Sequence, residues 1–451
     1  MDSMVSRRTL EWFLAGALAL VCSVVPAGAQ APAPAPVPDP HAGHTMPMPG
    51  MSDMPADDAM LAMSLFPARD ASGTAWLPDA SPMYGVSRQT HQWALMLHGN
   101  GFLQYLQEFA PEPRGAHQAG SINWFMVMAR RSVGAGRIGV RTMFSLEPWT
   151  IRGCGYPDLL ATGELCKGDD IHDRQHPHDL FMEAAVEYER PVSSTVRWQI
   201  YGGPAGEPAL GPAAFPHRLS AMPNPIAPIT HHWLDATHVS YGVVTSGVYG
   251  DRWKAEASLF NGREPDERRT DFDLAALDSV SARLSWLPTA SLVMQVSAGH
   301  LNDAEPVAGG SSRVDVKRVT ASATYVRASG DRWLWATTAG WGSNLETGSR
   351  THGLLVESAI TVAEHHTWFG RVEVNGKPAH ALHIHESNGV FTVAKMQVGY
   401  TRYLTPRHGL QPGLGGFLSA AIVPADLQPR YGGVGTGLGL FLTLRPGAHG
   451  M

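Results

Sequence analysis

The sequence is poor in charge, and beyond its N-terminal region it has no apolar stretch long enough for a membrane-spanning helix. Only 16% of its 451 residues are charged, against roughly 25% in soluble domains. A spanning helix needs about 18 or more consecutive apolar residues. A transmembrane β-barrel reconciles the two absences, because half of each strand faces lipid and no stretch need be apolar throughout. The net charge of −6 is too small to indicate nucleic-acid binding.

Signatures of common enzymes and of soluble β folds are also absent. The pattern Gly-x-Ser-x-Gly of many hydrolases does not occur, and there is no glycine-rich phosphate-binding loop. A soluble sandwich or propeller would need a more charged surface, and the blade repeats of a propeller are not found. The sequence therefore predicts that the protein is not an enzyme. A barrel enzyme with serine and histidine on its strands remains an alternative.

Cysteine is scarce, with three residues in the whole chain. Cys22 lies in an expected secretory signal peptide at 1–29, which has a charged region, an apolar core and a small-residue cleavage site. Cys154 and Cys166 remain as a close pair in an exported protein, where disulfides persist. We expect a disulfide that closes one loop, and a metal site with two thiolates is the alternative.

Histidine and methionine, by contrast, are abundant, with 21 and 18 residues. The segment 30–63 is first rich in proline and then in methionine and histidine, without any helical or strand period, which predicts a disordered tail. Thioethers select Cu(I), and imidazole also suits Cu(II). We interpret the tail as a copper-capturing segment; a tail with no ligand role is the alternative. Its candidate ligands are His41, His44, Met46, Met48, Met51 and Met54.

From residue 91 onward the chain alternates between apolar and polar side chains. After residue 179, for example, Leu180 and Met182 fall on one face and Glu183 and Glu187 fall on the other. A period of two residues indicates a strand with one apolar face. Repetition of this pattern predicts an all-β chain of about sixteen antiparallel strands, the first near 91–109.

The connections between these stretches alternate in length. Short turns such as 132–136 alternate with long loops such as 204–235. Long loops on one rim and short turns on the other are typical of outer-membrane barrels. We therefore predict a transmembrane β-barrel over 91–445, with its last strand near 434–444 and an irregular lead-in at 64–90 before it.

Charged residues fall on the polar phase of the predicted strands. Arg141, Glu183, Lys254 and Arg283 are examples. An Arg or Lys on the lipid face at mid-bilayer would cost about 2–4 kcal/mol, so we expect these side chains to face the lumen. They predict a solvated channel wall, and a specific ion path is the alternative.

One short stretch, 171–179, concentrates possible metal ligands. It contains His172, His176 and His178 together with Asp173 and Asp179. Its proline, between the last two histidines, prevents a helix, so the loop must wrap for the imidazoles to converge. The aspartates would be ligands themselves or would orient the imidazoles. The segment predicts a metal site; a structural polar network and a catalytic role are the alternatives.

Further histidines fall in other predicted long loops. Neighbouring loops on one rim can pool ligands, so we expect the histidines of 171–179 to converge there, on one another or on His231, His232, His383 or His385. His98 and His238 fall on the polar phase of predicted strands and should face the lumen. The loop histidines are His217, His231 and His232 in 204–235, His352 in 342–352, and His380, His383 and His385 in 376–392.

Over 91–445 the sequence resembles bacterial outer-membrane β-barrels, and its tail resembles the outer-membrane proteins of copper-resistance systems. The resemblance implies the outer membrane of a Gram-negative bacterium, with the tail in the periplasm. The implied partners are lipid, metal ions and periplasmic metal-handling proteins, without nucleic acid. We predict a role in binding, transport or resistance to a transition metal, copper first. The alternatives are a porin-like channel or structural barrel whose histidines only hold loops together, and a barrel enzyme.

Overall fold

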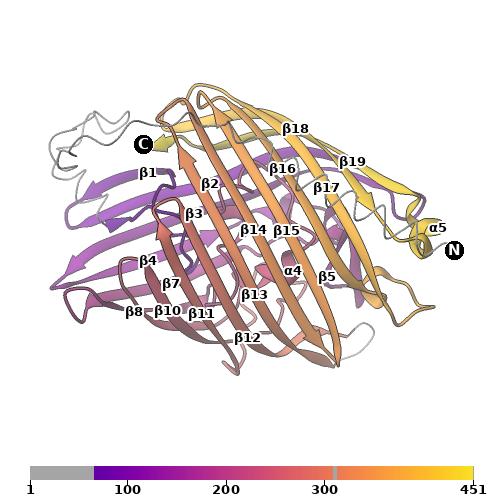
Figure 1. Ribbon diagram of the computed structural model, residues 1–451, viewed down its shortest axis with the longest axis horizontal. Helices are drawn as coiled ribbons and strands as arrows, with labels where there is room; N and C mark the ends of the chain where they lie inside the picture. The colour runs from indigo at the N-terminus through magenta and orange to yellow at the C-terminus, as the bar shows by residue number, and fades with distance from the viewer. Residues whose placement is uncertain (1–64, 308–311, 450–451) are drawn as a thin grey trace, which may run out of the picture. The chain divides into compact units, whose positions relative to one another are not determined.

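The computed structural model describes residues 65–307 and 312–449, all of which lie in one compact unit, 48–451. The predicted signal peptide and metal-binding tail lie outside the described residues. Sixteen antiparallel strands form a closed barrel, because the last of them, β19, pairs with the first, β2 (Figure 1). The prediction of about sixteen strands is therefore confirmed.

The barrel strands run in chain order around the wall. Each pairs with the next one along the barrel. They are β2 (Trp93–Phe109), β3 (Ala116–Val133), β4 (Gly136–Phe144), β7 (Phe181–Pro191), β8 (Arg197–Ala205), β9 (Val243–Tyr249), β10 (Trp253–Phe260), β11 (Ser279–Thr289), β12 (Leu292–Pro306), β13 (Arg313–Ala328), β14 (Trp333–Glu346), β15 (Ser349–Val362), β16 (His366–Pro378), β17 (Val390–Tyr403), β18 (Leu410–Ile422) and β19 (Val434–Pro446).

Two further strands complete the wall at its seam. The pairing of β19 with β2 stops at Gly101, which leaves the first residues of β2 without a partner on that side. The strand β1 (Met83–Thr90) pairs there with β2, and β20 (Ala448–His449) pairs with β1. The irregular lead-in predicted at 64–90 is thus wrong for its last eight residues, because the free backbone groups of β2 need a hydrogen-bonding partner.

The outer face of the barrel is apolar. On β19, Leu440, Leu442 and Leu444 are about half exposed, while the residues between them are buried on the lumen side. An apolar band facing outward is what contact with lipid requires, and the chain is a membrane-spanning barrel of the outer-membrane type. Among the described residues no helix is long and apolar enough to cross a membrane.

A charge on this outer face is expected to destabilise the barrel according to its depth. Leu440 lies in the middle of β19 and Val434 at its first residue, with exposed fractions of 55% and 56%. Leu440→Arg should lower the free energy of unfolding in lipid vesicles by about 2–4 kcal/mol, and Val434→Arg by about 0–1 kcal/mol. Urea titration followed by tryptophan fluorescence measures both. Equal effects at the two positions would contradict a lipid-facing β19.

The connections differ between the two rims, as predicted, with one exception. β14 and β15 meet in a tight connection at 347–348, where a long loop at 342–352 was predicted. Both strands simply extend further, and Glu346 pairs with Ser349. His352, assigned by the sequence to a rim loop, instead lies on the exposed face of β15 and stacks on Trp341. It therefore takes no part in a loop site.

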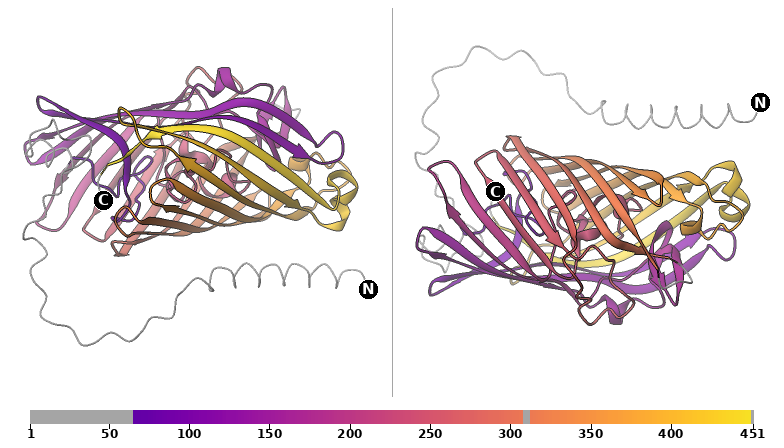
Figure 2. Two further views of the ribbon diagram at one scale, coloured as in Figure 1. Left: turned by 90° about the horizontal axis from the view of Figure 1, so that it is seen from above. Right: turned by 90° about the horizontal axis from the view of Figure 1, so that it is seen from below.

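Three segments fold into the lumen instead of standing on the rim (Figures 1 and 2). They are 65–82, the stretch 145–180 between β4 and β7, and the stretch 206–242 between β8 and β9. We call the last of them, 206–242, the plug. The second contains α3 (Glu147–Thr150), β5 (Tyr156–Cys166) and β6 (Asp169–Gln175). The plug contains η1 (Phe215–His217), α4 (His231–Leu234) and η2 (Ala236–His238); the remaining short helices are η3 (His380–Leu382), η4 (Ala425–Leu427) and α5 (Gln428–Tyr431).

The plug contacts walls that lie far apart around the barrel. On β2, Asn100 donates a hydrogen bond to the Met222 carbonyl oxygen over 3.1 Å. On β16, Arg371 donates to the Ile226 carbonyl oxygen over 2.9 Å. On β12, the Ser297 hydroxyl accepts from the Gly211 amide over 2.8 Å. Because these strands belong to different sides of the barrel order, the plug spans the lumen.

The charged residues of the lumen wall are buried by these segments. Arg141, Lys254 and Arg283 are at most 2% exposed, although they do face the lumen as predicted. On the plug, Arg218 forms an ion pair with Asp235 and another, over 2.7 Å, with Glu357 of β15. The expectation of a solvated channel wall is therefore wrong: the wall charges pair with each other and with the plug.

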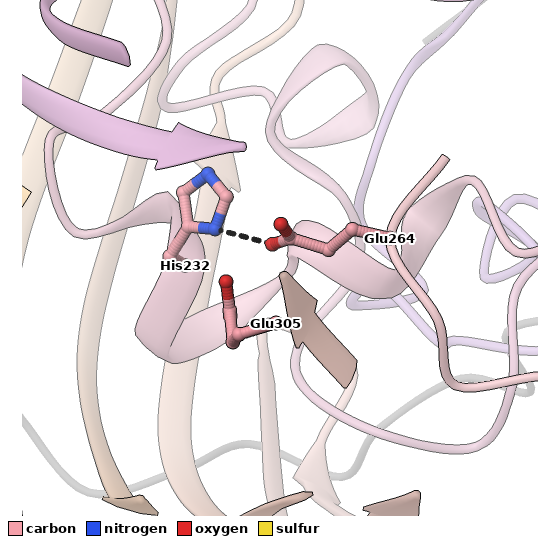
Figure 3. A group of neighbouring side chains, drawn as sticks. All are labelled: His232, Glu264 and Glu305. Carbon is pink, nitrogen blue, oxygen red and sulfur yellow. Dashed lines mark ion pairs between the residues drawn. The ribbon is translucent and has the colours of Figure 1, made fainter. Parts of the chain in front are cut away.

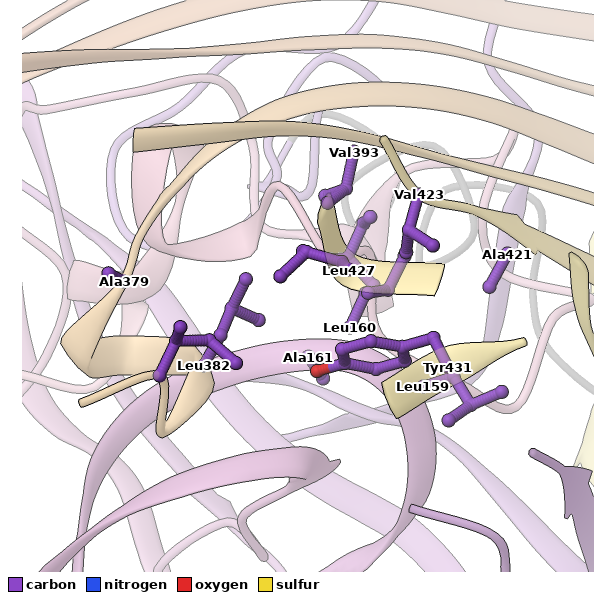
Figure 4. Packing of buried hydrophobic residues seen from close by; sticks show 12 residues of the cluster. Leu159, Leu160, Ala161, Ala379, Leu382, Val393, Ala421, Val423, Leu427 and Tyr431 are labelled. Carbon is purple, nitrogen blue, oxygen red and sulfur yellow. The ribbon is translucent and has the colours of Figure 1, made fainter. Parts of the chain in front are cut away.

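Apolar packing holds the hairpin of β5 and β6 inside the barrel. Leu159 and Leu160 of β5 are fully buried against Leu382, Leu427 and Tyr431, which come from the loops after β16 and β18 (Figure 4). Cys154 and Cys166 form the predicted disulfide, with Cα atoms 5.7 Å apart. Such a crosslink restricts the loop that carries these leucines.

Candidate metal centre in the lumen

A group of three side chains from distant parts of the chain meets near the long-loop end of the lumen (Figure 3). His232 comes from α4 of the plug, Glu264 from the loop after β10, and Glu305 from the end of β12. One ligand atom from each lies within 4.8 Å of the other two. His232 Nδ1 is 3.0 Å from Glu264 Oε1. We call this group the triad.

His232 and Glu305 of the triad line a cavity of about 360 Å³. The walls contribute four carboxylates and two imidazoles, and no lysine or arginine from residues 65–307 or 312–449 lines it. Such a lining favours a cation, because negative groups facing a space of low dielectric attract positive charge strongly. The titratable residues that line it are Glu164, Asp170, Glu305, Glu346, His232 and His380.

The protonation of the triad differs between its members. Burial, followed by the charge of Glu164, raises the pKa of the Glu264 carboxyl, so this acid would release a proton when a cation binds. Burial lowers the pKa of His232. His232 is thus neutral at pH 7, the form in which an imidazole binds metal. Within the described part of the chain, His232 Nδ1, the nitrogen that faces Glu264, and Glu264 Oε2 are buried without a hydrogen-bond partner. Buried polar atoms without a partner are unusual and indicate a missing ligand.

A glycine of β5 allows His232 to take this position. Gly163 has φ +123°, and a Cβ added there would lie 2.1 Å from His232 Nε2. Only a residue without a side chain fits both the backbone angle and the ring. The neighbouring Glu164 places a carboxylate 3.3 Å from His176 Nε2, so β5 adds acidic groups next to the triad.

The histidines of 171–179 do not meet at one point. Each lies against a histidine of another segment, at ring-centre distances of 4.6 Å for His172 to His383, 5.9 Å for His176 to His232 and 5.3 Å for His178 to His238. The expected position on the rim is wrong for His176 and His178, because burial of the leucines of β5 draws the hairpin inward.

The aspartates of the same stretch are held by arginines. Asp173 forms an ion pair with Arg114 over 2.7 Å and accepts from the Leu160 amide. Asp179 lies 3.4 Å from Arg269. Asp173 also lies 2.9 Å from His172 Nδ1, so it orients that imidazole, one of the two roles expected from the sequence, and the contacts with arginine help to position the hairpin.

His172 and His383 instead line an open pocket of about 770 Å³ at the mouth of the barrel, together with Asp169 and Asp170. Asp170 also lines the cavity beside the triad, so the two spaces adjoin. His385 lies next to His383, with ring centres 5.3 Å apart. The pooling of ligands between loops, predicted from the sequence, occurs here between β6 and η3.

The two histidines that were expected on strands both face the lumen. His98 packs on Trp124 and lies near His217 of the plug, with ring centres 4.7 Å and 5.5 Å apart. His238 is not on a strand but in η2 of the plug. The triad carboxylates Glu264 and Glu305 were missed, since no spacing in the sequence connects them with His232. The candidate ligands from His41 to Met54 lie outside the described residues.

No family model and no curated protein matches the chain. The solved structures similar to it are bacterial outer-membrane β-barrels. OmpF of Salmonella typhi, in complex with daunomycin, has a TM-score of 0.47 at 9% identity, over 79% of this chain and 99% of that chain. OprB of Pseudomonas putida has a TM-score of 0.45 at 8% identity, over 78% of this chain and 94% of that chain. OmpT of Vibrio cholerae has a TM-score of 0.44 at 8% identity, over 80% of this chain and 99% of that chain. At these identities and TM-scores the likeness concerns the barrel and carries no argument about function.

Proposed function

We propose that this outer-membrane barrel binds divalent transition-metal ions inside its lumen, as a step in handling such ions at the outer membrane. The observation that carries the proposal is the triad of His232, Glu264 and Glu305, whose ligand atoms lie within 4.8 Å of one another beside a cavity lined by carboxylates. One imidazole with two carboxylates suits Zn²⁺ and similar borderline ions. A set without sulfur disfavours Cu(I) at this position.

The tail predicted from the sequence has the complementary chemistry. Its histidine and methionine side chains from His41 to Met54 would take copper in either oxidation state. β2 begins and β19 ends at the short-turn rim, the periplasmic side in barrels of this type. We therefore propose a periplasmic tail that gathers ions, periplasmic metal-handling proteins as partners, and a lumen that binds ions separately.

The experiment compares zinc binding by the full mature chain and by Glu264→Gln/Glu305→Gln. Removal of groups that only orient a ligand weakens metal binding by about 10–100-fold. Loss of two ligands should therefore weaken the affinity for the one bound Zn²⁺ by more than about 100-fold. Isothermal titration calorimetry measures the affinity, and elemental analysis measures the zinc retained. The tail is present in both proteins, so its contribution cancels.

The control is Glu386→Gln, a carboxylate in the loop after β16 whose side chain is 70% exposed and pairs with Arg430. It belongs to no group of possible ligands among the described residues and should leave zinc binding unchanged. Equal zinc content in the wild type and in the double variant would refute the lumenal site. A porin-like channel would then be the better explanation.

A further inference from the structure

We infer a Cu(I) site in the lumen whose ligands are the His217 imidazole and the Met143 thioether, with His98 and Met126 as adjoining donors. It goes beyond the triad, because it has different ligands and selects a different ion. His217 belongs to η1 of the plug, and the other three residues come from the neighbouring wall strands β2, β3 and β4. The site is therefore complete only when the plug is docked on this part of the wall.

The three donors of the wall form a row on its lumen face. His98 lies opposite Met126 in the register of β2 with β3, and Met126 lies opposite Met143 in the register of β3 with β4. Residues directly opposite each other have Cβ atoms about 4.5–5.5 Å apart. Met126 and Met143 are buried, while Phe125 and Val127 on either side of Met126 are exposed on the outer face. The row thus turns one imidazole and two thioethers toward the lumen.

The plug adds an imidazole directly to this row. His217 Nε2 lies 3.4 Å from Met143 Sδ. A metal such as zinc has bonds of about 2.0 Å to nitrogen and about 2.3 Å to sulfur, and with such bonds one ion can hold both atoms at close to a tetrahedral angle. The ring centre of His98 is 5.5 Å from that of His217, so a second imidazole stands beside the pair.

The ring nitrogens at this place lack strong hydrogen-bond partners. His98 Nδ1 donates to the Tyr84 carbonyl oxygen, which leaves the lone pair of a neutral ring on Nε2. Among the described residues, the His217 ring has one hydrogen-bonding contact, the Met143 sulfur, which is a weak acceptor. Buried polar atoms normally have good partners. Methionine also fills cores by its shape, but filling alone gives no reason for a buried nitrogen to face the sulfur.

The charge around the site suits a monovalent ion. Burial lowers the pKa of His217 well below its usual range, so this imidazole is neutral at pH 7, and thioethers carry no charge. Arg141 lies two residues from Met143 on the same face of β4, and it pairs with Glu183 over 3.2 Å. Without a carboxylate among the ligands, the charge of the ion stays uncompensated, and burial of one charge costs less than burial of two.

An aromatic ring covers the site. The ring centre of Trp124 is 4.5 Å from that of His217 and 4.7 Å from that of His98. The face of a tryptophan ring attracts cations and does so more strongly where water is excluded. Thioethers select Cu(I), whereas the triad has no sulfur and suits divalent ions. The lumen therefore offers two sites of opposite preference.

The test counts the Cu(I) ions that the full mature chain keeps against excess bicinchoninate, a chelator that colours on binding Cu(I), without oxygen. Met143→Leu removes the sulfur at nearly constant volume, a change that usually costs less than about 1.5 kcal/mol. Loss of a ligand should weaken binding by more than the roughly 10–100-fold that follows loss of an orienting group. Met143→Leu and His217→Gln should thus each keep one Cu(I) fewer than the wild type. The tail is present in every protein, so its contribution cancels.

The matched control is Met96→Leu. Met96 is a buried methionine of β2 that packs on Leu65 and Phe66 in a different cluster, and its variant should keep as many Cu(I) ions as the wild type. The Glu264→Gln/Glu305→Gln protein should also keep the full Cu(I) count while it loses zinc, so the two sites can fail independently. An unchanged count in Met143→Leu, or an equal loss in Met96→Leu, would refute the Cu(I) site and leave the triad standing.

A second measurement covers the case in which Met143→Leu does not fold. Wild-type crystals grown with Cu(I) locate the ion by anomalous diffraction at the copper absorption edge. A peak between the His217 ring and the Met143 sulfur supports the site. Copper peaks elsewhere, with none at this position, overturn it.

Discussion

Excision of residues 207–239 should turn the filled barrel into an open pore. Gly206 and Ser240 pair across the base of the plug, so a two-residue Asn-Gly turn can join them as in an ordinary hairpin. A barrel of sixteen strands is wide enough for an aqueous channel, and the plug is the segment that contacts β2, β12 and β16 across the lumen, so its removal should open a passage beside 65–82 and 145–180. Single-channel recording in planar bilayers should show low conductance for the wild type and a large, steady conductance for the excised form.

The control for this experiment changes a loop that stays outside. Replacement of 385–389 by glycine and serine alters an exposed stretch after β16 and leaves the plug intact, so the wild-type conductance should persist. Folding of each variant is checked by the mobility of unheated protein on gels. A folded, excised barrel that conducts no better than the wild type would show that the plug is not the segment that blocks the lumen.

Arg218→Met should loosen the plug without opening the wall. Arg218 is 0% exposed and pairs with both Asp235 and Glu357. Removal of one partner of a buried ion pair leaves an uncompensated charge and typically costs about 3–5 kcal/mol. Amide hydrogen exchange of the plug, measured by mass spectrometry on the folded barrel, should accelerate by roughly a hundredfold to a few thousandfold, since each 1.4 kcal/mol is a factor of ten.

Two variants make this result specific to the buried charge. Arg430→Met removes an exposed pair with Glu386, and exposed pairs contribute little, so exchange in the plug should stay at the wild-type rate. Addition of Glu357→Gln to Arg218→Met removes one of the orphaned charges and should restore part of the protection. Unchanged exchange in Arg218→Met would mean that the pair does not hold the plug.

The barrel wall was predictable because its physical requirement is repeated in every strand. Lipid outside and polar groups inside impose a period of two, which Leu440, Leu442 and Leu444 display on β19. That pattern fixed the number of strands and their approximate limits. The pattern could not reveal β1. This strand pairs with the first residues of β2, and those residues lack a partner only when the barrel closes.

The position of the long loops could not be read from their length. The sequence does contain a signal that a loop is not on the surface: Phe215, Ile226 and Trp233 of the plug are large and apolar, and all are buried. Such residues are seldom placed in solvent-exposed loops. Leu159 and Leu160 give the same indication for β5. The length of these loops and the polarity of their flanking residues predicted a position on the rim, but their buried apolar residues place them inside the lumen.

The proximity of loop histidines to one another was predictable, but the members of the candidate site were not. Histidine-rich loops did bring imidazoles together, as for His172 with His383. Glu264 and Glu305 are far from His232 in the sequence and fall in unremarkable stretches, so only the closed barrel brings them together. A motif of nine residues could not reveal a site whose ligands come from three segments.

Because α4 of the plug carries His232, binding of an ion at the proposed triad site and docking of the plug would be thermodynamically linked. An ion that binds only the docked form adds stability that grows with its concentration, about 2.7 kcal/mol at a hundred times its dissociation constant. The reverse also holds: anything that pulls the plug from the wall separates His232 from Glu264 and Glu305 and thereby lowers the affinity for the ion. A mechanical or conformational pull on one end of the segment is then sufficient to release a tightly held ion, without any competing ligand.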